Sequence, residues 1–205
     1  MVDLTTILNG RRLLIFDFDG TIADTSPLHA RAFSDVLAPH GIAVDYARIA
    51  GMKTADALAK AAKIAGRSIP PEAIPELVAQ KQSVVRSMIA IGLQPLPGVD
   101  DFLLWAKSRF AVCLVTSGSR GTVALALDKL GYADLFDPII CADDIVAAKP
   151  DPDGFLTALR LTATLPAQAL VFEDSDAGFD SARAAGLDYV DVRDNPWVAL
   201  QGCTS

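Results

Sequence analysis

The sequence predicts an α/β protein with a Rossmann-like parallel sheet, helices on both faces of the sheet, and an inserted small, all-helical cap. Short apolar runs alternate with longer stretches of helical periodicity. The apolar runs are continuous, which is typical of strands buried on both faces of a parallel sheet. Strand–helix alternation of this kind indicates a doubly wound core. A long segment without a good strand follows the first apolar run and indicates the inserted cap.

Five apolar runs are the expected strands, and four helical stretches between or beside them are the expected core helices. The strands are predicted at residues 12–16, 111–115, 138–142, 169–172 and 189–192. The helices are predicted at residues 99–108, 122–130, 152–161 and 176–185. Gly131 and Gly186 follow two of these helices, at the position where a glycine commonly forms the C-terminal cap.

Residues 25–95 break the alternation of strands and helices. Glycine and proline turn signals divide this segment into pieces of helical periodicity. We therefore expect a core domain made of residues 1–24 and 96–205 and a helical cap domain made of residues 25–95. The two connections, near residues 24–27 and 94–98, would act as hinges.

Composition excludes several kinds of partner. Asp and Glu number 25 against 18 Lys and Arg, and no basic stripe offsets the net charge of −7, so nucleic acid is not an expected partner. No apolar run reaches the roughly 18 residues of a membrane helix, and the N-terminus lacks the features of a signal peptide. We expect a cytoplasmic protein with no membrane partner. The three cysteines lie far apart, so no disulfide framework is expected; the oligomeric state is not predicted.

Two aspartates directly follow the first predicted strand. The run is Asp17-Phe18-Asp19-Gly20-Thr21, and alternation along an extended chain sends Asp17 and Asp19 to the same side. In an open parallel sheet, ligands bind at the carboxyl ends of the strands. Two carboxylates this close repel each other, so a cation or a shared proton is expected beside them. The alternative is a solvated Asp-Gly turn, which the other motifs disfavour.

Three further polar motifs follow predicted strands or apolar runs. Thr116 and Ser117 begin a strand-to-helix turn, where hydroxyls and unpaired N–H groups can hold an anion, although they are also ordinary helix caps. Lys149 closes an apolar run and is either a solvated charge or a neutralising cation. Glu173 and Asp174 supply adjacent carboxylates, which are oxygen ligands suited to Mg²⁺. Helix capping by Asp174 or Ser175 is compatible with that role.

The four motifs, in this order, resemble those of the haloacid dehalogenase superfamily over residues 12–193. The position of the cap is similar to that in the helical-cap subfamily, which contains β-phosphoglucomutases, phosphoglycolate phosphatases and sugar phosphatases. The short chain and the ending at residues 191–193, Asp-Val-Arg, resemble the bacterial fructose-1-phosphate phosphatases. The resemblance implies a Mg²⁺-dependent phosphatase that acts on a small sugar or polyol phosphate through an aspartyl-phosphate intermediate.

The resemblance also implies a role for each matching residue. Asp17 corresponds to the nucleophile, and Asp19 corresponds to the general acid/base. The residues implied in phosphate binding are Thr116, Ser117 and Lys149. The residues implied in Mg²⁺ binding are Asp17, Asp19 through its backbone carbonyl, Asp174, and Glu173 directly or through water. Because a general acid needs a proton beside a charged neighbour, we expect the pKa of Asp19 to be raised.

Other activities of the superfamily are less compatible with the sequence. Dehalogenases and phosphonatases lack an acid at the position of Asp19, and Lys53 lies one position away from the cap lysine of phosphonatases. His29 matches a histidine of hexose phosphate mutases that aligns the acid/base group. However, Thr54 stands where β-phosphoglucomutase has the arginine that binds a second phosphate, and Lys53 offers only a point charge. We therefore favour a phosphatase over a mutase or a phosphoglycolate phosphatase.

His29, Lys53 and Thr54 remain the predicted substrate contacts from the cap. The expected partner is a small phosphorylated metabolite. A protein that binds such a ligand without turnover is the alternative from another functional class, and it is disfavoured because no motif residue is missing.

Overall fold

A computed structural model describes residues 4–194 and Trp197, and at its centre is a parallel sheet of five strands in the order β3-β2-β1-β4-β5. The strands are β1 (Leu13–Phe16), β2 (Ala111–Val115), β3 (Ile139–Ile140), β4 (Ala169–Glu173) and β5 (Asp188–Asp191). β1 lies between β2 and β4, with Leu13 in register with Ala111 on one side and Ala169 on the other. The carboxyl ends of all the strands therefore lie at one edge of the sheet.

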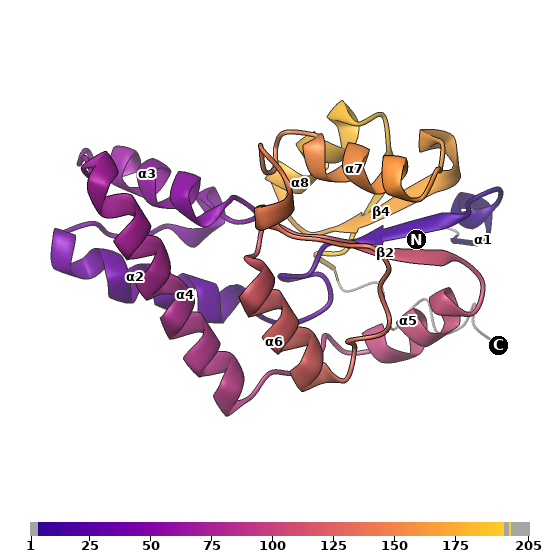
Figure 1. The fold of residues 1–205 in the computed structure, drawn as a ribbon, viewed down its shortest axis with the longest axis horizontal. Helices are drawn as coiled ribbons and strands as arrows, with labels where there is room; N and C mark the ends of the chain where they lie inside the picture. Colours follow the sequence, from indigo (N-terminus) through magenta and orange to yellow (C-terminus); the bar gives the residue numbers. More distant parts are fainter. Residues whose placement is uncertain (1–3, 195–196, 198–205) are drawn as a thin grey trace.

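Helices cover both faces of the sheet, as the fold class predicts (Figure 1). The helices α7 (Asp153–Leu161) and α8 (Asp176–Ala184) cover one face, and α5 (Val99–Lys107) and α6 (Arg120–Leu130) cover the other. Side chains alternate along β1, so that Leu13 and Ile15 pack on the α7–α8 side while Leu14 and Phe16 pack on the α5–α6 side. This two-sided burial is the physical reason for the continuous apolar runs. α1 (Leu4–Leu8) precedes β1 and packs against the α5–α6 side.

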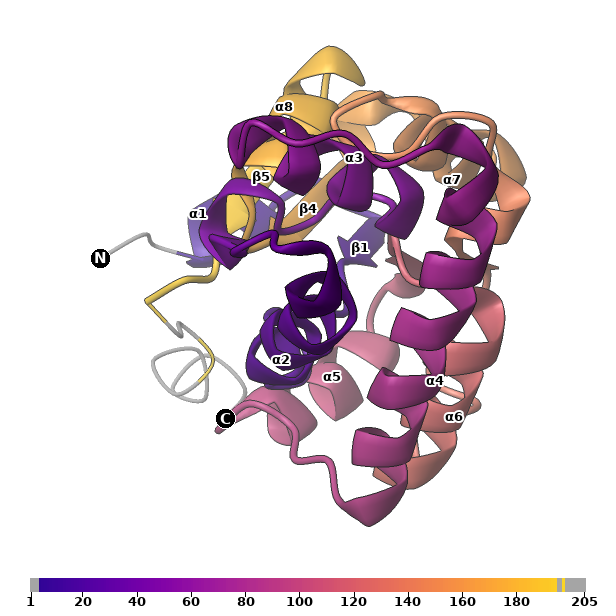
Figure 2. The ribbon, with the colours of Figure 1, turned by 90° about the vertical axis from the view of Figure 1, so that its left-hand side faces the viewer.

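Residues between β1 and α5 form a helical insertion (Figure 2). It has its own apolar cluster. Its main helices are α2 (Ser26–Leu37), α3 (Thr54–Ile64) and α4 (Ile74–Ile91), joined by turns that include the 3-10 helices η1 (Ala38–His40), η2 (Tyr46–Arg48) and η3 (Pro71–Ala73). Phe33, Leu37 and Leu58 are among the residues buried within it. α4 also packs beside α6. The insertion is helical as predicted, and the division into domains at residues 24/25 and 95/96 stays a prediction.

The two connections to the insertion lie side by side. The backbone N–H of Asp24 donates to the carbonyl of Gln94, and that of Leu96 donates to the carbonyl of Ile22. A bridge between Ala23 and Pro95 joins the same segments. The insertion therefore leaves and rejoins the sheet layer at one point, beside the carboxyl end of β1.

Several predicted elements differ from the observed ones in length. The predicted strand 138–142 is only the two residues of β3, because residues 142–144 turn into the 3-10 helix η4 (Ala142–Asp144) and the N–H of Ala142 donates to Gly118. α6 begins at Arg120, two residues early, where the Asp143 carboxylate accepts a hydrogen bond from the Arg120 N–H. Gly131 adopts the predicted left-handed C-cap, with φ of 73°. The other core boundaries agree with the predicted ones to within one residue.

The remaining short element is the 3-10 helix η5 (Pro166–Gln168), which leads into β4. Among the described residues, no helix has the length and hydropathy of a membrane span.

Candidate active site

A buried ion-pair cluster lies at the carboxyl ends of β1 and β4. Asp17 follows β1, Glu173 ends β4, and Lys149 reaches both from the loop before α7. The Lys149 ammonium Nζ lies 2.6 Å from Asp17 Oδ1 and 2.6 Å from Glu173 Oε2, and it also donates to the Val115 carbonyl at 3.0 Å. All three charged side chains are buried, so the sheet topology brings together residues that are far apart in the sequence.

Asp174 adds a third carboxylate to this cluster. One oxygen each of Asp17, Glu173 and Asp174 lie within 4.8 Å of one another. Burial, followed by the charge of Glu173, raises the pKa of Asp17 well above its usual range and that of Asp174 to about 7, although Lys149 opposes both shifts. Three carboxylates thus face one ammonium. An all-oxygen donor set with excess negative charge fits a hard divalent cation.

Glu173 is held by protein donors on both of its oxygens. Oε1 accepts hydrogen bonds from the Ser175 N–H and hydroxyl and from the Asp174 N–H, while Oε2 accepts from Lys149. Gly178 lies directly over the carboxylate, where a Cβ atom would overlap it. Glu173 thereby orients both Lys149 and the start of α8. Its predicted role as a direct or water-mediated metal ligand stays a prediction.

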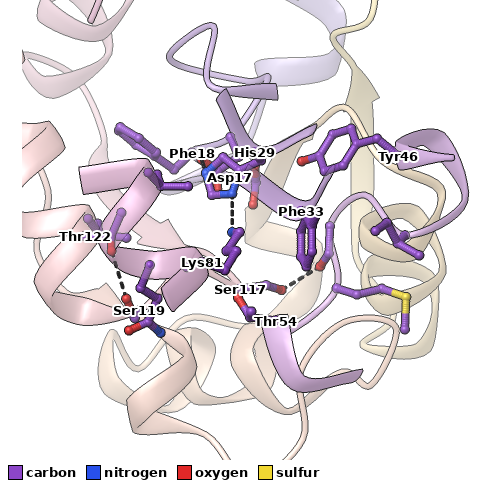
Figure 3. A pocket seen from close by; sticks show the side chains of 18 of the residues that line it. Asp17, Phe18, His29, Phe33, Tyr46, Thr54, Lys81, Ser117, Ser119 and Thr122 are labelled. Carbon is purple, nitrogen blue, oxygen red and sulfur yellow. Dashed lines mark hydrogen bonds and ion pairs between the residues drawn. The ribbon is translucent and has the colours of Figure 1, made fainter. Parts of the chain in front are cut away.

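Asp19 belongs to a second polar chain that runs into the helical insertion. Its Oδ1 accepts a hydrogen bond from the Thr25 hydroxyl at 2.6 Å and lies 3.1 Å from His29 Nε2. On the other side of the imidazole, Lys81 Nζ lies 2.6 Å from His29 Nδ1 (Figure 3). An ammonium can only donate, so with Lys81 protonated Nδ1 accepts and the Nε2–H donates to Asp19.

The pKa of Asp19 contradicts the expectation from the sequence. Burial alone would raise it, but the electrostatic attraction and hydrogen bond of the His29 Nε2–H, the hydrogen bond from Thr25 and the charge of Lys81 together lower the pKa of Asp19 well below its usual range. The expectation was wrong because it considered only the like-charged neighbour Asp17. Burial lowers the pKa of Lys81 itself to about 8, against the opposing effect of Asp19.

The loop after β2 brings the hydroxyls of Thr116 and Ser117, the predicted phosphate-binding groups, to the same edge of the sheet as Asp17. Thr116 is buried, and its Oγ1 accepts a hydrogen bond from the Gly118 N–H at 3.0 Å. The Ser117 hydroxyl instead donates to the Gly51 carbonyl of the helical insertion at 2.6 Å. Thr116 therefore retains its hydroxyl hydrogen for another acceptor, whereas Ser117 joins the loop to the insertion.

A cavity of about 40 Å³ separates Asp17 and Asp19 from the helical insertion (Figure 3). The insertion contributes a largely apolar wall that includes Phe33, Ile49 and Val85. Of the predicted cap contacts, His29 and Thr54 line the cavity. Lys53 is directed elsewhere, because its ammonium donates to the Ala142 carbonyl at 3.1 Å.

Two cavity residues, Lys81 and Tyr46, were missed by the sequence analysis. Lys81 lies on α4 in a buried stripe with Leu77, Val85 and Ile89 at helical spacing. A lysine within such an apolar stripe is a signal that could have been recognised, since buried lysines need a partner. Tyr46 lies on the short helix η2, where no periodic pattern marks its direction.

Comparison with known proteins adds relatives that cover almost the whole chain. A family model described as haloacid dehalogenase-like hydrolase matches residues 14–192. The fructose-1-phosphate phosphatase YqaB of Escherichia coli (strain K12) is 40% identical over 184 residues, covering 88% of this chain and 95% of that protein. A phosphorylated carbohydrates phosphatase of Thermotoga maritima is 29% identical over 181 residues, covering 86% of this chain and 82% of that protein.

A crystal structure of β-phosphoglucomutase from Clostridium difficile has the same fold. It superimposes with a TM-score of 0.80 at 23% identity and covers 95% of this chain and 97% of that chain. The family resemblance and the fold class predicted from the sequence are both confirmed by these matches.

Proposed function

The chain belongs to the haloacid dehalogenase-like hydrolase family and is a phosphatase, and from this premise we propose that it hydrolyses a small sugar or polyol phosphate with Mg²⁺ by phosphorylating its own Asp17. One observation carries the proposal. The buried Asp17 carboxylate is bound by Lys149 at 2.6 Å, lies within the cluster of acidic oxygens, and faces the same cavity as Asp19.

In the first step, Asp17 attacks the phosphorus of the ester. A bond forms between a carboxylate oxygen and phosphorus, the bond from phosphorus to the sugar oxygen breaks, and that oxygen takes a proton from Asp19. Lys149 and the Thr116 hydroxyl hold the transferred group and offset its charge. In the second step, Asp19 removes a proton from a water whose oxygen bonds to the phosphorus, and the bond from phosphorus to the Asp17 oxygen breaks, which releases phosphate and restores the carboxylate. The covalent intermediate divides one difficult displacement into two easier ones.

The acidic cluster supports a bound Mg²⁺. The side chains of Asp17 and Asp174 would hold it together with the backbone carbonyl of Asp19, and Glu173 would contribute directly or through water. The ion would supply positive charge that reduces the repulsion between the carboxylate and the anionic phosphate.

Asp19 must acquire a proton before it can act as the acid. In the free protein His29, Thr25 and Lys81 favour its ionised form. We propose that the anionic phosphate opposes these groups when it occupies the cavity beside Asp19, because a nearby negative charge raises the pKa of a carboxyl group. The same chain holds the Asp19 carboxylate in a fixed direction for both proton transfers.

The cavity supports a monophosphate with a neutral carbon skeleton. Among the described residues that line it, none is an arginine, and the sole lysine, Lys81, is bonded to His29. Hydroxyl and amide groups, such as those of Thr54 and Gln82, suit the hydroxyls of a sugar or polyol. The named substrate of the Escherichia coli relative, fructose 1-phosphate, belongs to this class.

One observation favours the alternative of a hexose phosphate mutase. A more open groove outside Asp174 is lined by Arg48, Lys60 and Arg193, which could meet the second phosphate of a sugar bisphosphate. A mutase would interconvert hexose phosphates when primed with such a bisphosphate and would release little inorganic phosphate. Phosphoglycolate hydrolysis has no comparable support, because no described cation in the cavity is left to pair with a carboxylate.

The test is a panel of sugar, polyol and other phosphorylated metabolites, assayed for phosphate release with Mg²⁺ and with EDTA. The wild type should hydrolyse at least one sugar or polyol phosphate, and EDTA should abolish this activity. The variant Asp17→Asn should lower kcat by at least about a thousandfold, because it removes the nucleophile. Robust turnover by Asp17→Asn, or equal rates with and without EDTA, would contradict the proposal.

A further inference from the structure

Tyr46 projects from the helical insertion into the cavity and has no role in the proposed mechanism. It begins the short helix η2, and its ring centroid lies 6.3 Å from that of Phe33. Its backbone carbonyl accepts hydrogen bonds from the N–H groups of Ile49 and Ala50, which fixes the turn that carries it. The hydroxyl end of the side chain turns toward the side of the cavity that carries Asp17 and His29 (Figure 3).

The phenol lies among carboxylates. Burial, followed by the charges of Asp19 and Asp174, raises the pKa of Tyr46 far above its usual range, so it stays protonated. The hydroxyl of Ser26 forms a hydrogen bond with the phenol, and because both hydroxyls can donate and accept, the phenol can turn its hydrogen toward a ligand. Ser26 itself lies beside the catalytic loop, because its Oγ would be 3.0 Å from a Cβ atom on Gly20.

Several other donors in the cavity are already committed. The Ser117 hydroxyl donates to Gly51, Ser119 donates to Thr122, and Lys81 is bonded to His29. Asp17 and Asp19, when ionised, can only accept. A hydroxyl-bearing substrate in this cavity therefore meets abundant acceptors and few donors, and the Tyr46 hydroxyl supplies one of those donors.

We infer that Tyr46 is a specificity-determining residue that donates a hydrogen bond to an oxygen of the sugar or polyol part of the substrate, near the phosphoester bond. This inference rests on the proposed function, since it assigns the leaving group and not the phosphoryl group to Tyr46. Phosphoryl binding and transfer stay with Lys149, Thr116 and Asp17. Loss of the hydroxyl should therefore affect substrates according to their leaving groups.

The experiment compares Tyr46→Phe with the wild type on two esters. One is the best sugar or polyol phosphate of the panel, and the other is p-nitrophenyl phosphate, whose leaving group has no aliphatic hydroxyls. Tyr46→Phe should lower kcat/KM for the sugar phosphate by about tenfold, mainly through KM, as expected for one hydrogen bond. The value for p-nitrophenyl phosphate should change by less than about twofold.

Tyr189→Phe is the matched control. Tyr189 stacks on Phe179, and neither residue is among the described residues that line the cavity. Tyr189→Phe should leave kcat/KM unchanged for both esters. An unchanged melting temperature should verify that Tyr46→Phe is folded. If Tyr46→Phe left kcat/KM for the sugar phosphate unchanged, or lowered kcat/KM equally for both esters, the inference would be overturned while the proposed function stayed intact. Hydrolysis of neither ester by the wild type would overturn the proposed function and this inference with it.

Discussion

At the scale of single residues, Asp17 and Asp19 have opposite environments although only Phe18 separates them. Burial and Glu173 favour the protonated form of Asp17, whereas His29, Thr25 and Lys81 favour the ionised form of Asp19. These protonation states of the free protein are the reverse of those that the proposed reaction uses, so bound Mg²⁺ would favour ionised Asp17 and the substrate phosphate would favour protonated Asp19. The chain from Lys81 through His29 to Asp19 therefore controls the direction and charge of the proposed acid/base.

Lys81 should control the alkaline side of the pH–rate profile. Its pKa of about 8 means that its positive charge is present below pH 8 and is lost as the pH rises through that value. We expect kcat of the wild type to fall above about pH 8. Lys81→Met should have a kcat lower by about tenfold or more and should lack this decline.

The exposed Lys107 on α5 supplies the control variant Lys107→Met, which should keep the profile of the wild type. A decline at the same pH in Lys81→Met would exclude Lys81 as its origin.

Site prediction from the sequence succeeded in grouping Asp17, Lys149 and Asp174, because each follows a strand or apolar run and parallel topology brings such positions together. It missed Lys81 and Tyr46, because the sequence does not show which face of the insertion turns toward the sheet. It also misjudged the pKa of Asp19, since two of the groups that lower it lie on α2 and α4. Geometry across the cavity is thus the information that the sequence lacks. The roles given to these residues stay predictions until variants are measured.

At the scale of elements, contacts from the loop before α3 hold the insertion against the sheet layer. Ser117 donates to the Gly51 carbonyl, and Lys53 donates to the Ala142 carbonyl. Gly51 has φ of +74°, and a Cβ atom there would overlap Ser175, so the close approach requires glycine. Gly51 also lines the cavity, so these contacts set how closely the loop approaches Asp17 and Asp19.

Lys53→Met should weaken the closed arrangement, because it keeps the alkyl chain and removes the donor to Ala142. We expect hydrogen exchange in residues 50–54 to accelerate and kcat/KM to fall by about two- to tenfold. Lys63→Met, on the exposed face of α3, is the control and should change neither quantity. Unaltered exchange in Lys53→Met would show that the Lys53 contact does not hold the loop.

Helix α8 packs so closely on β4 that Gly178 cannot carry a side chain. A Cβ atom there would overlap the Glu173 carboxylate, which Lys149 and Ser175 hold in place. Gly178→Ala should lower the free energy of unfolding by about 1–3 kcal/mol, despite the better helix propensity of alanine. Gly121→Ala in α6 is the control, because its Cβ atom would meet only Arg86 at 4.0 Å. Chemical denaturation should show a loss for the first variant alone.

At the scale of the whole molecule, the sequence predicted the parallel sheet and the helical insertion correctly because burial on both faces leaves a strong apolar signal. It overestimated β3, where side-chain and loop hydrogen bonds end the strand after two residues. The acidic cluster at the sheet edge links folding to the protonation state of the site, since it concentrates negative charge in the interior.

Stability in the absence of a divalent cation should fall as the pH rises from about 4 to about 7. The pKa of Asp174 is raised from 3.8 to about 7 in the folded chain, mainly by burial, so the folded chain binds this proton more tightly than the unfolded chain. Mg²⁺ favours the ionised form. Saturating Mg²⁺ should therefore raise Tm by about 5 °C or more near pH 8, and by less near pH 5.

Asp174→Asn should lose most of this Mg²⁺-dependent rise, because it removes one charged ligand. Asp176→Asn is the matched control, since Asp176 is exposed at the first position of α8 and lies outside the acidic cluster. An equal Mg²⁺ effect in both variants would mean that the ion stabilises the protein at another place.

The most direct test of the account is to trap the phosphorylated enzyme. The wild type would be mixed with its best sugar phosphate and Mg²⁺, quenched in acid within the first turnover, and digested for mass spectrometry. We predict one phosphoryl group on the peptide that contains Asp17, converted to homoserine at that position by borohydride and absent from Asp17→Asn. Phosphate release with no phosphorylated peptide at any quench time, or a phosphoryl group on another residue, would contradict the account.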